Sequence, residues 1–185
     1  MIIDRSREKL LNAIIFFSGK SYYSKTKLLK LLFLLDFEHF AQTGRSVTGV
    51  EYFAWHLGPV AVAVLDEFEE PSQDFSDSIE VRSEQIGHFS SQLALPKKPF
   101  NAAIFSKREL DLLDEIRRKY GSKTATELVE ITHSKNGPWD RVYDNKRGQY
   151  KPIPYELAVD DNTPNGASVL NAKRERDEFL SLLSA

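Results

Sequence analysis

Apolar residues dominate one stretch of the chain, residues 24–44 (SKTKLLKLLFLLDFEHFAQTG), and this stretch predicts a long helix. Leucine and phenylalanine fill most of its middle, so the helix has almost no polar face and must be covered on several sides. Ser24 is suited to cap the first free amides, and Gly44 can take the left-handed conformation that ends a helix. We therefore predict a buried central helix over residues 24–44.

This helix does not have the composition of a membrane span. Lys30, Asp36 and Glu38 interrupt it, whereas a spanning helix needs about 18 or more nearly uncharged apolar residues. Asp36 and His39 are three positions apart, so they share a face near the C-terminal end of the helix. Two interpretations stay open for this pair: structural groups that are hydrogen-bonded where the helix surfaces, or members of a functional site.

Helical spacing recurs on both sides of the central helix. Two capping boxes, which begin at Ser106 and Thr124, mark helix starts because each pairs a hydroxyl with a glutamate three residues later. Pro59 and Pro138 are each suited to the first turn of a helix. The predicted flanking helices cover residues 4–18, with Gly19 as the stop, and then 59–70, 106–120, 124–133, 138–143 and 169–183.

Strand signals are weaker and shorter. Residues 50–56 are rich in β-branched and aromatic side chains and predict a strand or β-ribbon arm. Residues 71–105 have no helical period, and we interpret them as a turn-rich loop with one or two short strands. The predicted fold class is mainly α with a small β-ribbon or short antiparallel sheet (α+β), in a single compact helical domain around the buried central helix.

Composition narrows the class of protein. With 185 residues, 41% hydrophobic and 28% charged, the chain predicts one ordinary globular domain. The net charge of −2 gives no electrostatic argument for a nucleic-acid or membrane partner. The chain has no cysteine, which excludes disulfides and thiolate metal sites, and the N-terminal apolar run has no small-residue cleavage site behind it. We therefore expect a cytoplasmic protein.

Residues suited to catalysis or metal binding are few. The candidates are His39, His56 and His133 with Asp36 and Asp140, and none has the spacing of a known metal or nucleophile motif. We expect no catalytic residue, no cofactor and no metal, and we keep a metal- or histidine-dependent hydrolase as one alternative. A DNA-binding regulator is another alternative, since the helices at 106–120 and 124–133 resemble a helix-turn-helix. The second of them lacks the Arg, Lys, Asn or Gln that reads bases, so we do not expect a nucleic-acid partner.

The run KLLKLLFLLDFEHFAQTGRSVTGVEYFAWHLGPV resembles the signature of the Panacea domain family, the SocA-like antitoxin domain of bacterial and phage toxin–antitoxin pairs. Further along, LVEITHSKNGPWDRVY resembles the Thr-His and Pro-Trp element of the same family. The residues that carry the resemblance include Lys27, Asp36, Trp55, Gly58, Pro59, Thr132, His133, Pro138 and Trp139.

The resemblance implies a mostly helical domain over residues 1–155, with a variable insert near 71–105 and a C-terminal extension, 156–185, that ends in a charged helix. It also implies a non-enzymatic protein that binds and neutralises a toxin encoded beside it. One type of member is a proteolytic adaptor, and the resemblance leaves open whether a Clp-type protease is a second partner. The toxin itself and the oligomeric state do not follow from the sequence.

The candidate partner-binding surface combines both parts of this signature. Large aromatics beside rigid Gly-Pro turns are good anchors, because they lose little side-chain freedom on binding. We predict that Trp55, His56, His133 and Trp139 border one surface, beside Gly58 and Pro59 of the ribbon. Asp36 and His39 are expected to support it from beneath, and Lys27 and Asp36 to anchor neighbouring loops. The opposing interpretation is that both tryptophans are core residues.

Overall fold

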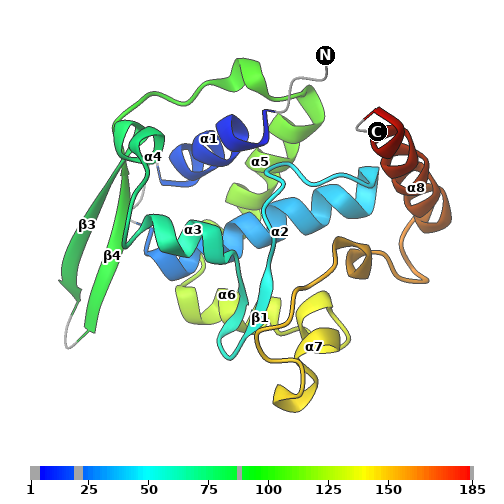
Figure 1. Cartoon of the computed structure of the whole chain (residues 1–185). Coiled ribbons are helices and arrows are strands. Elements are labelled where there is room, and N and C mark those ends of the chain that lie inside the picture. Colours follow the sequence, from blue (N-terminus) through cyan, green and yellow to red (C-terminus); the bar gives the residue numbers. More distant parts are fainter. Residues whose placement is uncertain (1–4, 19–22, 87–88, 184–185) are drawn as a thin grey trace.

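A long buried helix lies at the centre of the computed structural model, which describes residues 5–18, 23–86 and 89–183. This helix is α2 (Lys25–Thr43), and Figure 1 shows the other helices arranged around it. The Ser24 side chain accepts a hydrogen bond from the Lys27 amide at its start, and Gly44 ends it in the left-handed conformation. The predicted central helix and both of its caps are confirmed.

Several helices cover α2, as its apolar circumference requires. The described helices that contact it most extensively are α1 (Ser6–Ser18), α5 (Lys107–Tyr120), α6 (Ala125–Thr132) and α8 (Gly166–Leu183). The buried leucines, isoleucines and phenylalanines of α1, α5 and α6 form one continuous core with those of α2, and α8 adds the buried Val169 beside it. The mainly helical α+β fold class is confirmed.

The helices after residue 105 begin where their local signals predict. Both capping boxes are present: Ser106 and Glu109 at α5, and Thr124 and Glu127 at α6. Pro138 is the first residue of α7 (Pro138–Tyr143). The predicted last helix begins three residues earlier than expected, at Gly166, and packs against α2. The expected start and stop of the first helix, residues 4 and 19, lie outside the described residues.

The segment predicted as a turn-rich loop is more regular than expected. Residues of the PSQDFSDS stretch form α4 (Gln73–Ser78), in which Phe75 is buried. An antiparallel hairpin follows, β3 (Ile79–Ile86) paired with β4 (Phe89–Pro96), and Figure 1 shows it extending from the helical body. The prediction of a loop with one or two short strands was therefore wrong in extent.

The predicted ribbon is shorter than expected, and its proline has a different role. Strand β1 (Phe53–Trp55) pairs with β2 (Gly58–Val60), so Pro59 lies in a strand opposite Ala54 rather than at a helix start. A two-stranded ribbon tolerates proline because the missing amide can face away from the pairing edge. Helix α3 (Val62–Glu67) begins three residues later than predicted.

Three short 3-10 turns complete the described chain: η1 (Ala102–Ile104), η2 (Asp144–Lys146) and η3 (Tyr155–Ala158). None of the helices in the described ranges is both long and apolar enough to cross a lipid bilayer.

Candidate functional site

Strand β1 of the β1–β2 ribbon is paired along both of its edges. On one side β1 pairs with β2, and on the other side Phe53 bridges to Pro152. The amide of Ala54 donates to the carbonyl of Lys151 at 2.9 Å, and the amide of Tyr150 donates to the carbonyl of Ala54 at 2.8 Å. The segment before η3 therefore acts as a third strand and stiffens the ribbon.

A column of stacked rings supports the ribbon from α6 and α7. The centres of the His133 and Trp139 rings are 3.7 Å apart, and the rings are nearly parallel, at 4°. Tyr143 also stacks on Trp139, with 4.4 Å between the ring centres. Trp139 donates a hydrogen bond from Nε1 to the carbonyl oxygen of Trp55 at 2.9 Å. The predicted proximity of the ribbon to the exit of α6 is thus present in the structure.

Gly58 lies at the closest approach of the ribbon to two helices. A Cβ on this residue would be 2.9 Å from Nζ of Lys30, 3.0 Å from Nε2 of His133 and 3.1 Å from Oγ1 of Thr132. Its φ of +99° also favours glycine. The absence of a side chain at this position therefore lets three polar atoms from α2 and the end of α6 converge under the ribbon.

Of the three residues around Gly58, Lys30 supplies a buried amine. The residue is 2% exposed, and Nζ donates a hydrogen bond to the carbonyl oxygen of Pro59 at 2.8 Å. Burial lowers the pKa of Lys30 to about 7, because a low-dielectric environment disfavours the charged ammonium. In the sequence, Lys30 stands out only as an interruption of the apolar run. A lysine in the middle of a helix that is apolar all round nevertheless indicates that its amine needs a partner inside the protein.

His133 is held beside this amine. Burial lowers its pKa first, then the positive charges of Lys30 and His56 lower it further, while Asp140 opposes them. Its Nε2 atom is buried and has no hydrogen-bond partner among the described residues. His133 is therefore favoured in the neutral form beside the Lys30 amine.

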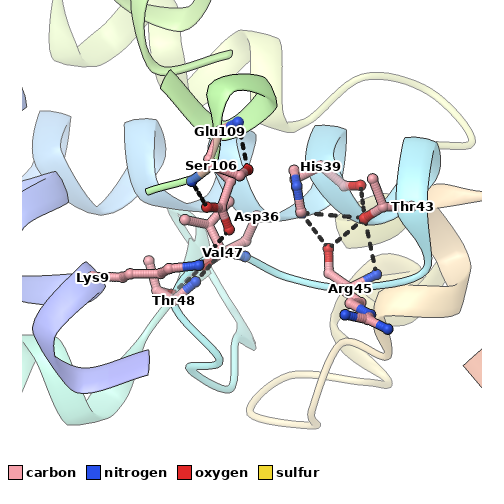
Figure 2. A network of polar contacts seen from close by, with 9 residues as sticks. All are labelled: Lys9, Asp36, His39, Thr43, Arg45, Val47, Thr48, Ser106 and Glu109. Carbon is pink, nitrogen blue, oxygen red and sulfur yellow. Dashed lines mark hydrogen bonds and ion pairs between the residues drawn. The ribbon is translucent and has the colours of Figure 1, made fainter. Parts of the chain in front are cut away.

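Asp36 fixes the chain that leads into the ribbon. The amides of Val47 and Thr48 each donate to its Oδ1 at 2.8 Å, as Figure 2 shows. The hydroxyls of Thr48 and Tyr52 donate to its Oδ2 at 2.5 and 2.7 Å. Burial raises the pKa of Asp36, whereas these four donors oppose that rise. Asp36 thus anchors a loop, and through Tyr52 it supports the entry to β1.

His39 holds the other end of the same loop. Its Nδ1 lies 2.7 Å from the carbonyl oxygen of Arg45 (Figure 2), and Thr43 donates to the His39 carbonyl at 2.8 Å. The residue is 6% exposed and faces a groove that Lys9 and Glu109 also line. The structure therefore does not bring His39 together with the ribbon residues.

Lys27 also lies apart from the ribbon. Its Nζ donates to the carbonyl oxygen of Gly121 at 2.6 Å and lies 3.8 Å from the centre of the Tyr23 ring. Gly121 ends α5, so Lys27 fixes that helix end to α2.

The outer end of the ribbon is exposed and apolar. His56 and Leu57 form the turn between the strands, and Leu57 is 57% exposed. Tyr150 is 62% exposed and contacts the half-buried Trp55 edge to face at 5.5 Å. Trp139, by contrast, is buried, so it supports this end rather than facing solvent. We call Trp55, His56, Leu57, His133 and Tyr150 the ribbon tip. Leu57 and Tyr150 were not among the residues predicted for this surface.

The comparison with protein families decides the classification. The family model described as antitoxin SocA-like, Panacea domain, matches residues 28–140, which is more than half of the chain. The chain belongs to this family. No curated protein and no solved structure matches it.

The Panacea match covers α2 from Leu28 onward, the ribbon, the hairpin and the start of α7. Of the predicted site residues it includes all except Lys27, which lies one position before it. Tyr150 and α8 lie after it. The SocA-like Panacea family is not a known enzyme family. Among the described residues, no three His, Asp or Glu side chains are grouped closely enough to hold a metal ion.

Proposed function

We propose that this chain is an antitoxin that neutralises a cognate toxin by direct contact through the ribbon tip. The family match carries the antitoxin part of this proposal. The contact surface is supported by the exposed Leu57 and Tyr150 beside the half-buried Trp55. Interface anchors are commonly aromatic side chains on a rigid support.

The rigidity of the ribbon favours this surface over a flexible loop. Strand pairing on both edges of β1 and the Trp139 hydrogen bond fix its backbone. A partner that binds a fixed ribbon does not have to order it, so more of the contact energy appears as affinity. The ribbon tip therefore combines exposed apolar area with a low cost of ordering.

The first test is growth rescue by variants of the ribbon tip. The protein is co-expressed with the product of its neighbouring gene, and a toxic neighbour identifies the toxin. Leu57→Ser with Tyr150→Ser should leave the thermal unfolding temperature nearly unchanged and abolish both rescue and co-purification. Leu182→Ser, which changes a side chain that is 77% exposed on α8, is the matched control and should rescue fully. Full rescue by the double variant would refute the ribbon tip as the contact surface.

Histidine substitutions test the inner border of the same surface. His56→Ala changes an exposed residue, whereas His133→Ala also removes a stacked ring. We expect the double variant, His56→Ala with His133→Ala, to lose rescue of growth. Its thermal unfolding is measured alongside. A folded double variant that rescues growth as the parent does would exclude both histidines from the toxin contact.

The mode of neutralisation needs a separate test. We propose occlusion of the toxin by binding. Rescue should then persist in a host strain that lacks its Clp proteases, and the amount of toxin should stay constant. Loss of rescue in that strain, together with a rise in toxin level, would instead identify the chain as a proteolytic adaptor.

A further inference from the structure

A second surface lies away from the ribbon tip. The start of α1, the loop after α2 and the end of α8 enclose a groove of about 660 Å³. His39 lines this groove, and the Lys9–Glu109 ion pair of 2.6 Å lies in its wall. Figure 2 shows His39, Lys9 and Glu109 around the loop that Asp36 anchors.

Three arginines from three separate elements face this groove: Arg5, Arg45 and Arg176. All three are exposed, and no described carboxylate forms an ion pair with any of them. By contrast, Lys9 is neutralised by Glu109 within the same groove. The groove therefore has an excess of positive charge in a chain whose net charge is −2.

The groove also has an apolar side. Phe179 is 57% exposed, and Leu180 lines the groove beside it. An exposed phenylalanine next to unpaired guanidinium groups matches a partner that carries both carboxylates and an apolar side chain. Arginine binds carboxylates with two parallel hydrogen bonds, which gives such a contact orientation as well as charge.

Nucleic acid fits this groove less well than an acidic peptide. Arg176 is flanked on α8 by the carboxylates of Glu175 and Asp177. These carboxylates would repel a continuous phosphate backbone, whereas a peptide can place its carboxylates one at a time. Phosphate binding also favours an extended basic surface, which this short groove does not provide.

We infer that this groove receives an acidic segment of a partner protein, with its carboxylates on Arg5, Arg45 and Arg176 and an apolar side chain on Phe179. The groove combines Arg45 from the region matched by the Panacea family with Arg5 and Arg176 from outside it. It is a contact surface distinct from the ribbon tip, and its occupant is a partner of defined chemistry.

The test measures binding of a short fluorescein-labelled peptide, in which Glu alternates with Leu, to the full chain by fluorescence anisotropy. Arg5→Gln, Arg45→Gln and Arg176→Gln together should weaken binding about tenfold or more, and the affinity of the parent should fall with added salt. The matched control replaces Arg118, Arg141 and Arg147, which do not line the groove, and should change affinity less than about twofold. Circular dichroism melts establish that both triple variants are folded.

The apolar contact is tested by a second pair of measurements. Phe179→Ser should weaken binding of the Glu–Leu peptide and leave binding of a Glu–Ser peptide of equal length unaffected.

Equal losses in the two triple variants, no binding to the parent, or tighter binding of a single-stranded oligonucleotide of equal charge would each overturn the inference. The measurement needs no toxin, so its failure would leave the ribbon-tip proposal untouched, and failure of toxin rescue would leave this inference untouched.

Discussion

The indole Nε1 of Trp139 donates a hydrogen bond to the carbonyl oxygen of Trp55 at 2.9 Å, which joins α7 to the ribbon across 84 positions of sequence. Trp139→Phe removes this donor and part of a buried ring. We expect a loss of about 1–3 kcal/mol in the free energy of unfolding, measured by urea titration. Trp55→Phe is the control, because its backbone oxygen keeps the bond. If the two variants lose equal stability, the hydrogen bond does not fix the ribbon.

Removing the carboxylate of Asp36 should destabilise the protein strongly. Asp36→Ala leaves two backbone amides and two hydroxyls without their acceptor, and we expect a loss of at least about 3 kcal/mol in urea unfolding. Asp36→Asn should cost less, because its amide oxygen still accepts from the backbone and its NH₂ group can donate to the hydroxyls. Equal losses for the two variants would contradict this role of the four donors.

Lys30 should make stability depend on pH. Its pKa falls from the ordinary 10.5 to about 7 on folding, so between these values the unfolded chain binds more protons. Stability should therefore rise with pH, by at most about 1.4 kcal/mol per unit, between about pH 7 and the ordinary lysine pKa of 10.5.

The control for this pH dependence is Lys30→Met, which keeps much of the length of the side chain and removes the titrating amine. Urea unfolding of this variant should depend less on pH over the same range. A parent and a variant with the same pH slope would show that Lys30 does not titrate near neutrality.

Leu32 tests whether α2 is the core of the fold. Its side chain is fully buried, so Leu32→Ala should leave a cavity and cost about 2–5 kcal/mol. Leu57→Ala, at an exposed position, should change stability by less than about 0.5 kcal/mol. Superimposable urea curves for Leu32→Ala and the parent would contradict the central place of α2.

The elements predicted well from sequence are those whose signals are local. Ser24, Ser106 and Thr124 each bond amides within their own helix turn, so a few adjacent letters specify the helix start. The apolar circumference of α2 likewise indicates its burial without knowledge of its neighbours. The mainly helical fold therefore follows from the amino-acid sequence alone.

The elements predicted poorly depend on distant contacts. Arg82 and Glu84 are polar residues within β3, and only cross-strand pairing with β4 establishes that strand over eight positions. From the sequence alone, Pro59 is suited to the start of a helix. Its place in β2 depends instead on pairing with Ala54 and on the hydrogen bond from the buried Lys30 amine, 29 positions earlier. Tyr150 was missed for the same reason, since its contact with Trp55 joins residues far apart in the sequence.

The pairing of β3 with β4 has a consequence for how such chains can diverge. The strands are matched residue for residue, from Ile79 opposite Pro96 to Ile86 opposite Phe89. Removing or adding residues in matched pairs at the outer end would keep every remaining pair in register and every side chain on its face. The hairpin can therefore change length between related proteins while Ile79 and Leu93, which are buried at its inner part, stay in place. Related proteins can therefore differ in the surface of this hairpin without any change to the helical core.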